Sequence, residues 1–260
     1  MMFEEVHVVL VEDDPYGRDL MAMLLWRDWR TRVVGETGSL SDLAEGLSGP
    51  KAQIIIVDTE HPENPEWVPE ATRIIQAFQP KAGILCVATH ADWGNFSRFC
   101  QPPYCGYVLK HEIAYSLAWA VCLAAVGHWV VTPSVEKMAV EKGLRPVVLS
   151  GENPYPGLTI QEAETARQGI LFNLPRQNLA NEKCKSPDTI YEYISKAYEK
   201  LGVKGICEGK VAVEDFFSSQ GAFLHYFKPG LDHIWKMASG AKAREKDTLA
   251  FHLLTLPEIV

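Results

Sequence analysis

The sequence predicts an α/β unit, in which helices cover a parallel sheet, followed by an all-α unit. Short apolar runs alternate with helical patterns through the first half of the chain, which is typical of βαβ connections. Acidic residues directly follow two of these runs, as expected at the carboxyl ends of parallel strands. From Thr159 onward the pattern consists of capped helices, which indicates a separate helical unit.

The strands and helices of the first unit follow from apolar spacing. Five strands are expected, near residues 6–11, 31–34, 54–57, 83–87 and 106–109. A helix is expected after the first strand, where Leu20, Met23 and Leu24 recur at helical spacing. Another is expected after Lys110, where Ile113 and Leu117 begin a similar pattern.

Polar side chains follow three of the expected strands. Glu12, Asp13 and Asp14 follow the first strand, Asp58 follows the third, and Lys110 follows the fifth. Because parallel strands end at one edge of a sheet, these side chains are expected to meet there. Carboxylates with few other ligands suit Mg²⁺, and a lysine pairs with phosphate as a point charge. The pattern therefore predicts a site that accepts a phosphoryl group on Asp58.

Residues 6–126 resemble the receiver domain of bacterial two-component response regulators. The matching segments are VVLVEDD, IIIVDTEHP around Asp58, and GYVLK ending at Lys110. The resemblance implies a doubly wound, flavodoxin-like sheet of five strands and phosphorylation of Asp58 by a sensor histidine kinase. It also implies that Mg²⁺ is bound by Asp13, Asp14 and Asp58.

Two positions bear on how such a domain would switch. Tyr107 falls where the family carries a switch aromatic. The family also has a Thr or Ser at the end of the fourth strand, which hydrogen-bonds the phosphoryl group, and the usual spacing places Ala88 there. Either a small shift in the following loop lets Thr89 serve, or the hydroxyl is missing and the coupling to Tyr107 is weaker.

Composition narrows the class of protein. No apolar run approaches a membrane span and the first residues lack a signal pattern, so we expect a cytoplasmic protein without membrane contact. The six cysteines show no disulfide-like or zinc-like spacing, which fits free thiols in a reducing compartment. Apart from the Asp58 cluster there is no nucleophile elbow, P-loop or metalloprotease motif, so no independent enzyme activity is expected.

The net negative charge of the chain lies in its first half. Residues 1–125 hold 17 acids and 9 bases, a net of −8, and residues 155–204 hold 6 acids and 7 bases, a net of +1. Near-neutrality of the second unit gives little electrostatic support for a nucleic-acid partner.

The predicted domain order is a receiver domain (1–126), a linker with some helix (127–155), a helix-turn-helix domain (156–204) and an aromatic-rich, helical C-terminal extension (205–260). Ser150 to Gly157 is rich in turn formers, which marks the boundary before the helical unit.

Local signals place the helices of the second unit. Thr159 followed by Glu162 is a capping box, and a second helix is expected from about 175 to 182. Ser186 followed by Pro187 starts a third helix. This third helix carries a buried stripe, and Gly202 ends it. The residues of that stripe are Ile190, Ile194, Ala197 and Leu201. Short helices joined by a tight turn predict a helix-turn-helix.

Residues 158–203 are similar to the NarL/LuxR-type DNA-binding domain. The matching segments are LTIQEAE, LPRQNLA, SPDTIYEYIS and KLGV. The resemblance implies binding to promoter DNA, with dimerisation to double the contacts. The chain has one extra residue in GILFN relative to the family, and an acid, Glu192, at a usually basic or amide position. The expected DNA-binding residues are Lys185, Asp188, Tyr191, Glu192, Lys196 and Lys200.

An alternative function is an atypical receiver protein that works without phosphorylation. It would act as a protein-interaction module or a constitutively dimeric regulator. Ala88, Glu192 and the aromatic extension favour this alternative. That extension must bury much apolar surface, and its aromatic residues are Phe216, Phe217, Phe223, Tyr226, Phe227, Trp235 and Phe251.

Overall fold

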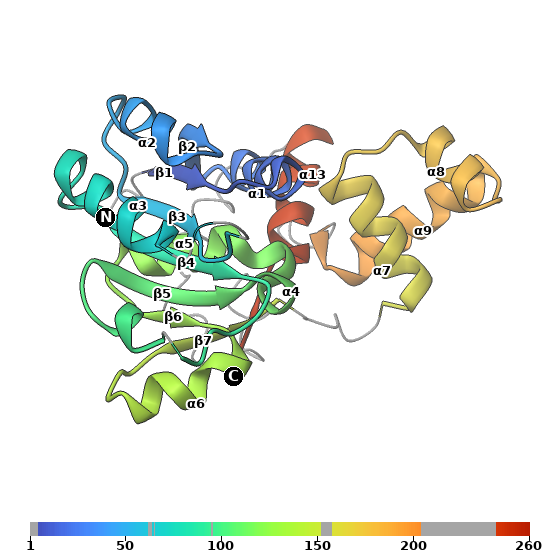
Figure 1. Ribbon diagram of the computed structural model, residues 1–260. Coiled ribbons are helices and arrows are strands. Elements are labelled where there is room, and N and C mark those ends of the chain that lie inside the picture. Colours follow the sequence, from blue (N-terminus) through green and yellow to red (C-terminus); the bar gives the residue numbers. More distant parts are fainter. Residues whose placement is uncertain (1–4, 62–63, 65, 95, 152–157, 204–242) are drawn as a thin grey trace. The chain divides into compact units, whose positions relative to one another are not determined.

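The structure, a computed structural model, describes residues 5–61, 64, 66–94, 96–151, 158–203 and 243–260 (Figure 1). The described chain falls into two compact units. One contains residues 5–151 together with the C-terminal residues 257–260, and the other contains residues 158–203 and 243–256. None of the helices within these ranges is both long and apolar enough to cross a membrane.

The first unit is built on a single, mostly parallel sheet. Its spatial order is β2-β1-β3-β4-β5-β6-β7-β8, and only the β7–β8 pair is antiparallel. The strands are β1 (Val6–Val11), β2 (Thr31–Thr37), β3 (Ile54–Asp58), β4 (Gly83–Ala88), β5 (Tyr104–Leu109), β6 (Val130–Val131), β7 (Val147–Ser150) and β8 (Glu258–Ile259). The α/β prediction is confirmed, but the predicted number of five strands is wrong. Within the described residues the sheet has eight strands, because β6, β7 and β8 continue it beyond the five strands expected from the sequence.

Helices cover both faces of this sheet. On one face α1 and α5 contact each other, and α5 crosses β1 to β4. On the other face α2, α3, η1 and α6 bury their apolar side chains in a common core with β3, β4 and β5. The helical segments are α1 (Pro15–Arg27), α2 (Leu40–Gly46), α3 (Trp67–Phe78), η1 (Phe96–Cys100), α4 (Lys110–Ile113), η2 (Ala114–Ser116), α5 (Leu117–Ala125) and α6 (Pro133–Glu141). The doubly wound arrangement is therefore present.

The stretch predicted as a linker, residues 127–155, contributes β6, α6 and β7 to the first unit. Gly106 on β5 makes the added pairing possible, because a Cβ atom there would lie 2.5 Å from the backbone oxygen of Val130 on β6. That atom would also lie 2.7 Å from the Leu85 side chain. Without a side chain at residue 106, β6 can pair with β5.

Gly106→Ala is expected to lower the free energy of unfolding by about 2–3 kcal/mol, since the added methyl overlaps a backbone atom that cannot rotate away. Urea unfolding followed by circular dichroism would measure the change. Gly46→Ala is the matched control, because a Cβ atom there meets nothing within 4 Å. Equal stabilities of the two variants would contradict the packing argument.

A charged pair lies inside the first unit. Asp28 and Arg30 are both fully buried; Arg30 donates from Nε to Asp28 Oδ1 at 2.8 Å and from Nη2 to Asp28 Oδ2 at 2.5 Å. The guanidinium carbon also lies 3.7 Å from the centroid of the Trp119 ring on α5. Burial lowers the pKa of Arg30, but the charge of Asp28, the nearby Cys122 and the hydrogen bonds to Asp28 together outweigh it, so the net shift of the pKa is upward. The pair links the C-terminal end of α1 to α5, because Asp28 follows α1 and Arg30 contacts Trp119.

The second unit contains the predicted helix-turn-helix. Its described helices are α7 (Ile160–Ala166), the π-helical turn η3 (Arg167–Leu171), α8 (Arg176–Glu182), α9 (Pro187–Lys200) and α13 (Ala243–Leu254). The capping box is confirmed, since Thr159 and Glu162 each accept from the other's backbone N–H. The Ser186 side chain caps α9 by accepting from the Thr189 N–H. The predicted stripe of α9 is buried.

A π-helical turn lies in the region where the resemblance implies one extra residue. A π-helical turn holds one more residue than an α-helical turn, so an insertion can be absorbed without breaking the helix. η3 spans residues 167–171, which include Gly169, and it packs against α8 and α13. The predicted helical extension is confirmed for α13, where Phe251 is buried. The other aromatic residues of the extension, in 205–242, lie outside the described residues.

Candidate functional site

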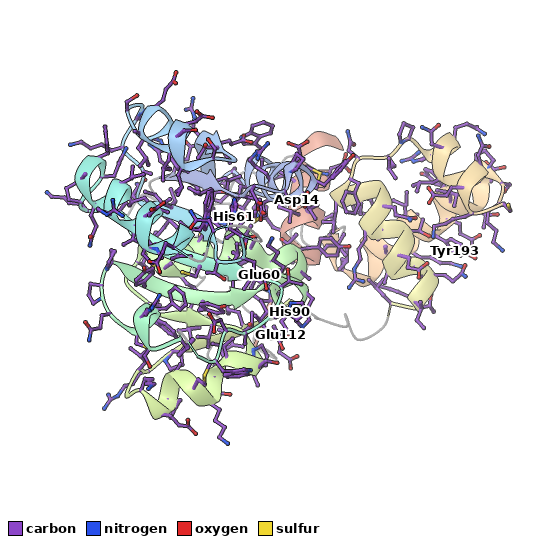
Figure 2. All side chains as sticks on the ribbon, viewed as in Figure 1. Asp14, Glu60, His61, His90, Glu112 and Tyr193 are labelled. Atoms are coloured by element: carbon purple, nitrogen blue, oxygen red, sulfur yellow. The ribbon has the colours of Figure 1, made fainter. Side chains whose placement is uncertain are left out.

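The predicted polar residues meet at the carboxyl edge of the sheet. Glu12 directly follows β1, Asp58 is the last residue of β3, and Lys110 begins α4 directly after β5. Carboxylate oxygens of Glu12, Asp13 and Asp58 lie within 4.8 Å of one another. Figure 2 labels several side chains along this edge, including Glu60, His61 and His90. The parallel topology therefore gathers residues that are far apart in the sequence.

Lys110 bridges two of the carboxylates. Its Nζ donates to Glu12 Oε2 at 2.7 Å and to Asp58 Oδ2 at 2.5 Å. Burial acts to lower the pKa of Lys110, but the hydrogen bonds and charges of Asp58 and Glu12 raise it overall. Glu12 is fully buried, and burial together with a hydrogen bond to Asp58 raises its pKa to about 7. The site is therefore a group of neighbouring carboxylates, two of which bind the ammonium group of Lys110.

Asp14 has a different place from the one predicted. Its side chain caps α1, where Oδ2 accepts from the Gly17 N–H at 2.8 Å and Oδ1 from the Tyr16 N–H at 3.3 Å. The family resemblance implies a metal site of Asp13, Asp14 and Asp58, whereas the structure groups Glu12 with Asp13 and Asp58. The sequence held a signal for Glu12, since it is the first residue after the buried run of β1.

The donor set fits a small divalent cation. All three grouped residues offer carboxylate oxygens, which are the ligands that Mg²⁺ prefers. Asp58 and Glu12 are buried while Asp13 is partly exposed, so the group opens to solvent on one side and leaves room for the waters that Mg²⁺ retains. His61 lies beside the group, with Nε2 3.9 Å from Asp13 Oδ2 and its ring stacked on Trp67.

Asp58 is further fixed by its own loop. Its Oδ1 accepts from the Glu60 N–H at 2.7 Å, and its backbone oxygen accepts from the Trp67 indole N–H at 3.0 Å. With Lys110 on Oδ2, both carboxylate oxygens have a donor. The side chain is therefore held in one orientation, with its charge compensated.

The last residue of β4, where the family carries a Thr or Ser, is Ala88. It is fully buried and pairs with Leu109 of β5. Thr89 follows outside the strand and is exposed, and its backbone N–H donates to Glu60 Oε2 at 3.0 Å. Burial raises the pKa of Glu60, but hydrogen bonds from Thr89 and His90 outweigh it and lower the pKa overall. Thr89 thus interacts with Glu60 in this structure.

Tyr107 is fully buried on β5 and reaches the loop after β4. Its hydroxyl donates to the His90 backbone oxygen at 3.3 Å and accepts from the Asp92 N–H at 3.4 Å. The ring meets Phe96 edge-on, with centroids 5.6 Å apart. Tyr107 therefore fixes this loop from inside the core; its role as a switch residue stays a prediction.

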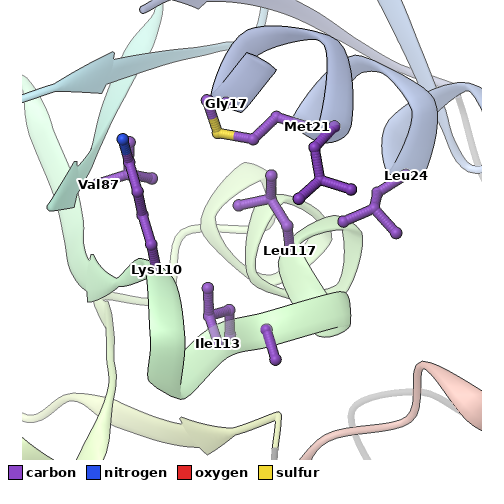
Figure 3. Close-up of a pocket in the computed structure, with 9 residues that line it drawn as sticks. Gly17, Met21, Leu24, Val87, Lys110, Ile113 and Leu117 are labelled. Carbon is purple, nitrogen blue, oxygen red and sulfur yellow. The ribbon is translucent and has the colours of Figure 1, made fainter. Parts of the chain in front are cut away.

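A small apolar cavity of about 80 Å³ lies beside Lys110 (Figure 3). Met21 and Leu24 of α1 line it on one side, and Ile113 and Leu117 line it on the other. The alkyl stem of Lys110 borders this cavity while its ammonium group reaches the acids. One side of the acidic group is thus shielded by hydrocarbon, which strengthens the electrostatic interactions there.

The DNA-binding residues predicted on α9 are exposed, but their charges are largely paired. Lys196 Nζ lies 2.6 Å from Glu192 Oε1, and Lys200 Nζ lies 2.6 Å from Glu162 Oε2. Asp188 lies in the first turn of α9, and Lys185 is exposed just before it.

One interaction on this surface was not predicted from the sequence. The Arg176 guanidinium of α8 lies 4.8 Å from the ring centroid of the exposed Tyr191 on α9. The contact joins two helices across a turn, so spacing within one helix gives no signal for it.

The fold and the site together define a receiver-type α/β unit followed by a helix-turn-helix unit. This is the arrangement that the sequence resemblance implied for response regulators of the NarL/LuxR type.

Comparison with known proteins gives the same class. The chain is 23% identical over 203 residues to the response regulator GacA of Pseudomonas protegens, covering 78% of this chain and 92% of that protein. It is 24% identical over 201 residues to the probable transcriptional regulatory protein NarL of Mycobacterium tuberculosis, covering 77% and 89%. A solved chain of the two-component response regulator RcsB–DNA complex matches with a TM-score of 0.47 and 19% identity, covering 76% and 93%. No family model matches the chain. The resemblance to response regulators is thus confirmed by the curated relatives.

Proposed function

We propose that this protein is a two-component response regulator in which Asp58 accepts a phosphoryl group and the helix-turn-helix unit binds promoter DNA. The observation that carries the proposal is the convergence of Glu12, Asp13 and Asp58 with Lys110 at one edge of the sheet. The relatives are named as a response regulator and as a probable transcriptional regulatory protein, which supports the DNA-binding part.

The proposed reaction is phosphoryl transfer from a phosphohistidine of a sensor histidine kinase. An Asp58 carboxylate oxygen attacks phosphorus, the P–N bond breaks, and the histidine nitrogen keeps the electron pair. The product is an acyl phosphate on Asp58. Lys110 holds the Asp58 carboxylate in one orientation before transfer, and it is close enough to stabilise the charge on the phosphoryl oxygens during transfer. Glu12, Asp13 and Asp58 would hold Mg²⁺, which supplies further charge neutralisation there.

The acyl phosphate is proposed to change the surface formed by β4, β5 and the loop after β4. Such a change would shift a pre-existing equilibrium towards a homodimer, or towards a helix-turn-helix unit that is free to bind DNA. The chemistry of the protein would then be limited to accepting the phosphoryl group, without an independent enzyme activity. A histidine kinase and promoter DNA as partners imply a cytoplasmic protein.

Beryllofluoride, a mimic of the phosphoryl group, tests the proposed site. Isothermal titration calorimetry should show binding that requires Mg²⁺ and is lost in Asp58→Asn. Asp13→Asn should weaken it strongly, whereas Asp14→Asn should keep it, since Asn also serves as an N-cap. Absence of binding to the unaltered protein would refute phosphoryl acceptance.

For DNA binding, Glu192→Gln is expected to raise the affinity several-fold and Lys185→Ala to lower it. Glu192 places a negative charge near the phosphates and neutralises Lys196. Fluorescence anisotropy at several salt concentrations would measure both, and loss of the Lys185 contact should reduce the salt slope by about 0.9. Glu141→Gln on α6 is the matched control, because it removes the same charge from the other unit.

A second candidate function is a regulator that binds another protein without phosphate or specific DNA. Two observations favour it: Ala88 occupies the end of β4, and both Lys196 and Lys200 are already paired with acids. Gel shifts against genomic fragments separate the candidates. A salt-dependent, sequence-preferring complex supports the response regulator, and no complex at low salt supports the protein-binding module.

A further inference from the structure

Glu60 connects the phosphoacceptor loop to the loop that follows β4. Its Oε2 accepts from the Thr89 N–H at 3.0 Å, and its Oε1 accepts from the His90 N–H at 2.9 Å. The His90 ring lies on the same carboxylate, with Nδ1 3.4 Å from Oε1. Both oxygens of one side chain thus bind two successive backbone N–H groups, although 29 and 30 residues separate the partners.

The register of the sheet places these two N–H groups next to Asp58. Asp58 pairs with Val87 of β4, and the Thr59 N–H donates to the Val87 oxygen at 2.9 Å. The Glu60 N–H donates to Asp58 Oδ1 at 2.7 Å. Thr89 and His90 follow β4 by one and two residues. The Glu60 side chain therefore spans the short gap between the ends of β3 and β4.

Two successive N–H groups that converge on one acceptor form a concave site for an anion. Hydrogen bonds from such groups to a charged carboxylate are stronger than those to a neutral acceptor. A phosphoryl group on Asp58 would bring three anionic oxygens to this same edge of the sheet. It would need donors at the end of β4, where Ala88 offers no hydroxyl.

We propose that the backbone N–H groups of Thr89 and His90 form an anion site that the Glu60 carboxylate fills in the resting protein. The site accepts carboxylate or phosphate oxygens. Glu60 thereby holds the loop after β4 in a bound conformation without phosphorylation, and it competes with a phosphoryl group for the same donors. The competition rests on the proposed function; the anion site itself does not.

Tyr107, which is buried in the core, contacts the same loop. The His90 N–H binds Glu60 while the His90 oxygen accepts from the Tyr107 hydroxyl, so one peptide segment is held from both sides. The Asp92 N–H donates to the same hydroxyl. Release of Glu60 would remove its hydrogen bonds with the Thr89 and His90 N–H groups, whereas the hydrogen bond from Tyr107 to the His90 oxygen would remain.

Amide hydrogen exchange of the whole protein tests the anion site without metal or phosphate. Glu60→Gln and Glu60→Ala should each speed exchange at Thr89 and His90 by about tenfold, since the charged acceptor is lost. Glu66→Gln, an exposed acid in the same connection, is the matched control. Added acetate or inorganic phosphate should restore protection in Glu60→Ala, because a free anion can enter the vacated site.

Unchanged exchange at both amides in both Glu60 variants would overturn the proposal. It would also be overturned if neither acetate nor phosphate restored protection in Glu60→Ala. Beryllofluoride with Mg²⁺ then tests the competition. Glu60→Gln should bind it about tenfold more tightly than the unaltered protein, and equal affinities would refute the competition. If neither protein binds beryllofluoride, the proposed function fails, while the exchange result still decides the anion site.

Discussion

Arg30→Ala is expected to lower the free energy of unfolding by about 3–5 kcal/mol, the largest effect of any substitution considered for this protein. Arg30 and Asp28 are both fully buried, so removal of the guanidinium leaves a carboxylate inside the protein without its cation. The substitution also removes the contact with the Trp119 ring, which lies 3.7 Å from the guanidinium carbon. Urea unfolding followed by circular dichroism would measure the loss.

Two further variants separate the buried pair from simple loss of a side chain. The double variant Asp28→Leu with Arg30→Met should be far more stable than Arg30→Ala, since both charges of the buried pair are replaced by apolar side chains. Arg32→Ala should change stability little, because its side chain is 64% exposed and its pairing with Glu5 at 3.8 Å is solvent-screened. A loss below about 1 kcal/mol in Arg30→Ala would contradict this account of the pair.

Lys110→Met is also expected to have a large effect, because it acts on both the stability of the protein and the chemistry of the site. In the absence of metal, Glu12 and Asp58 would lose the cation that compensates them, at a cost of about 2 kcal/mol after allowance for the partial exposure of the lysine. Phosphorylation by a small donor such as acetyl phosphate should slow by about a hundredfold, since a preorganised charge at the reacting oxygens is lost. Unfolding and phosphorylation rate are the two measurements.

The response to Mg²⁺ distinguishes a functional site from a merely structural ion pair. If the three carboxylates bind a cation, Mg²⁺ should restore much of the stability lost in Lys110→Met, because the metal replaces the missing charge. Lys137→Met, an exposed position on α6, controls for loss of a lysine. No recovery with millimolar Mg²⁺ would argue against a metal site at this edge of the sheet.

Local patterns predicted much of the fold. β1 to β5 were found from apolar runs, the α7 capping box from Thr159 and Glu162, and the buried face of α9 from its spacing. These features depend on a few neighbouring residues, so one sequence is enough to reveal them. The acidic group was also anticipated, because polar residues at the ends of parallel strands must meet.

The features that were missed depend on contacts between distant segments. β6 and β8 are two residues long, so apolar periodicity gives no signal for them, and their place is set by pairing with β5 and β7. Glu12 takes the place in the acidic group that the resemblance implied for Asp14, because helix capping by Asp14 turns its carboxylate towards α1. The contact of Glu60 with Thr89 and His90 depends on the alignment of β3 and β4, which no local pattern specifies.

The most direct measurement is the intact mass of the protein after incubation with acetyl phosphate and Mg²⁺. The account predicts a gain of one phosphoryl group, located on Asp58 by peptide analysis, absent without Mg²⁺ and absent in Asp58→Asn. An unchanged mass in the folded, unaltered protein, or a phosphoryl group that persists in Asp58→Asn, would contradict the assignment of this acidic group as the phosphoacceptor site.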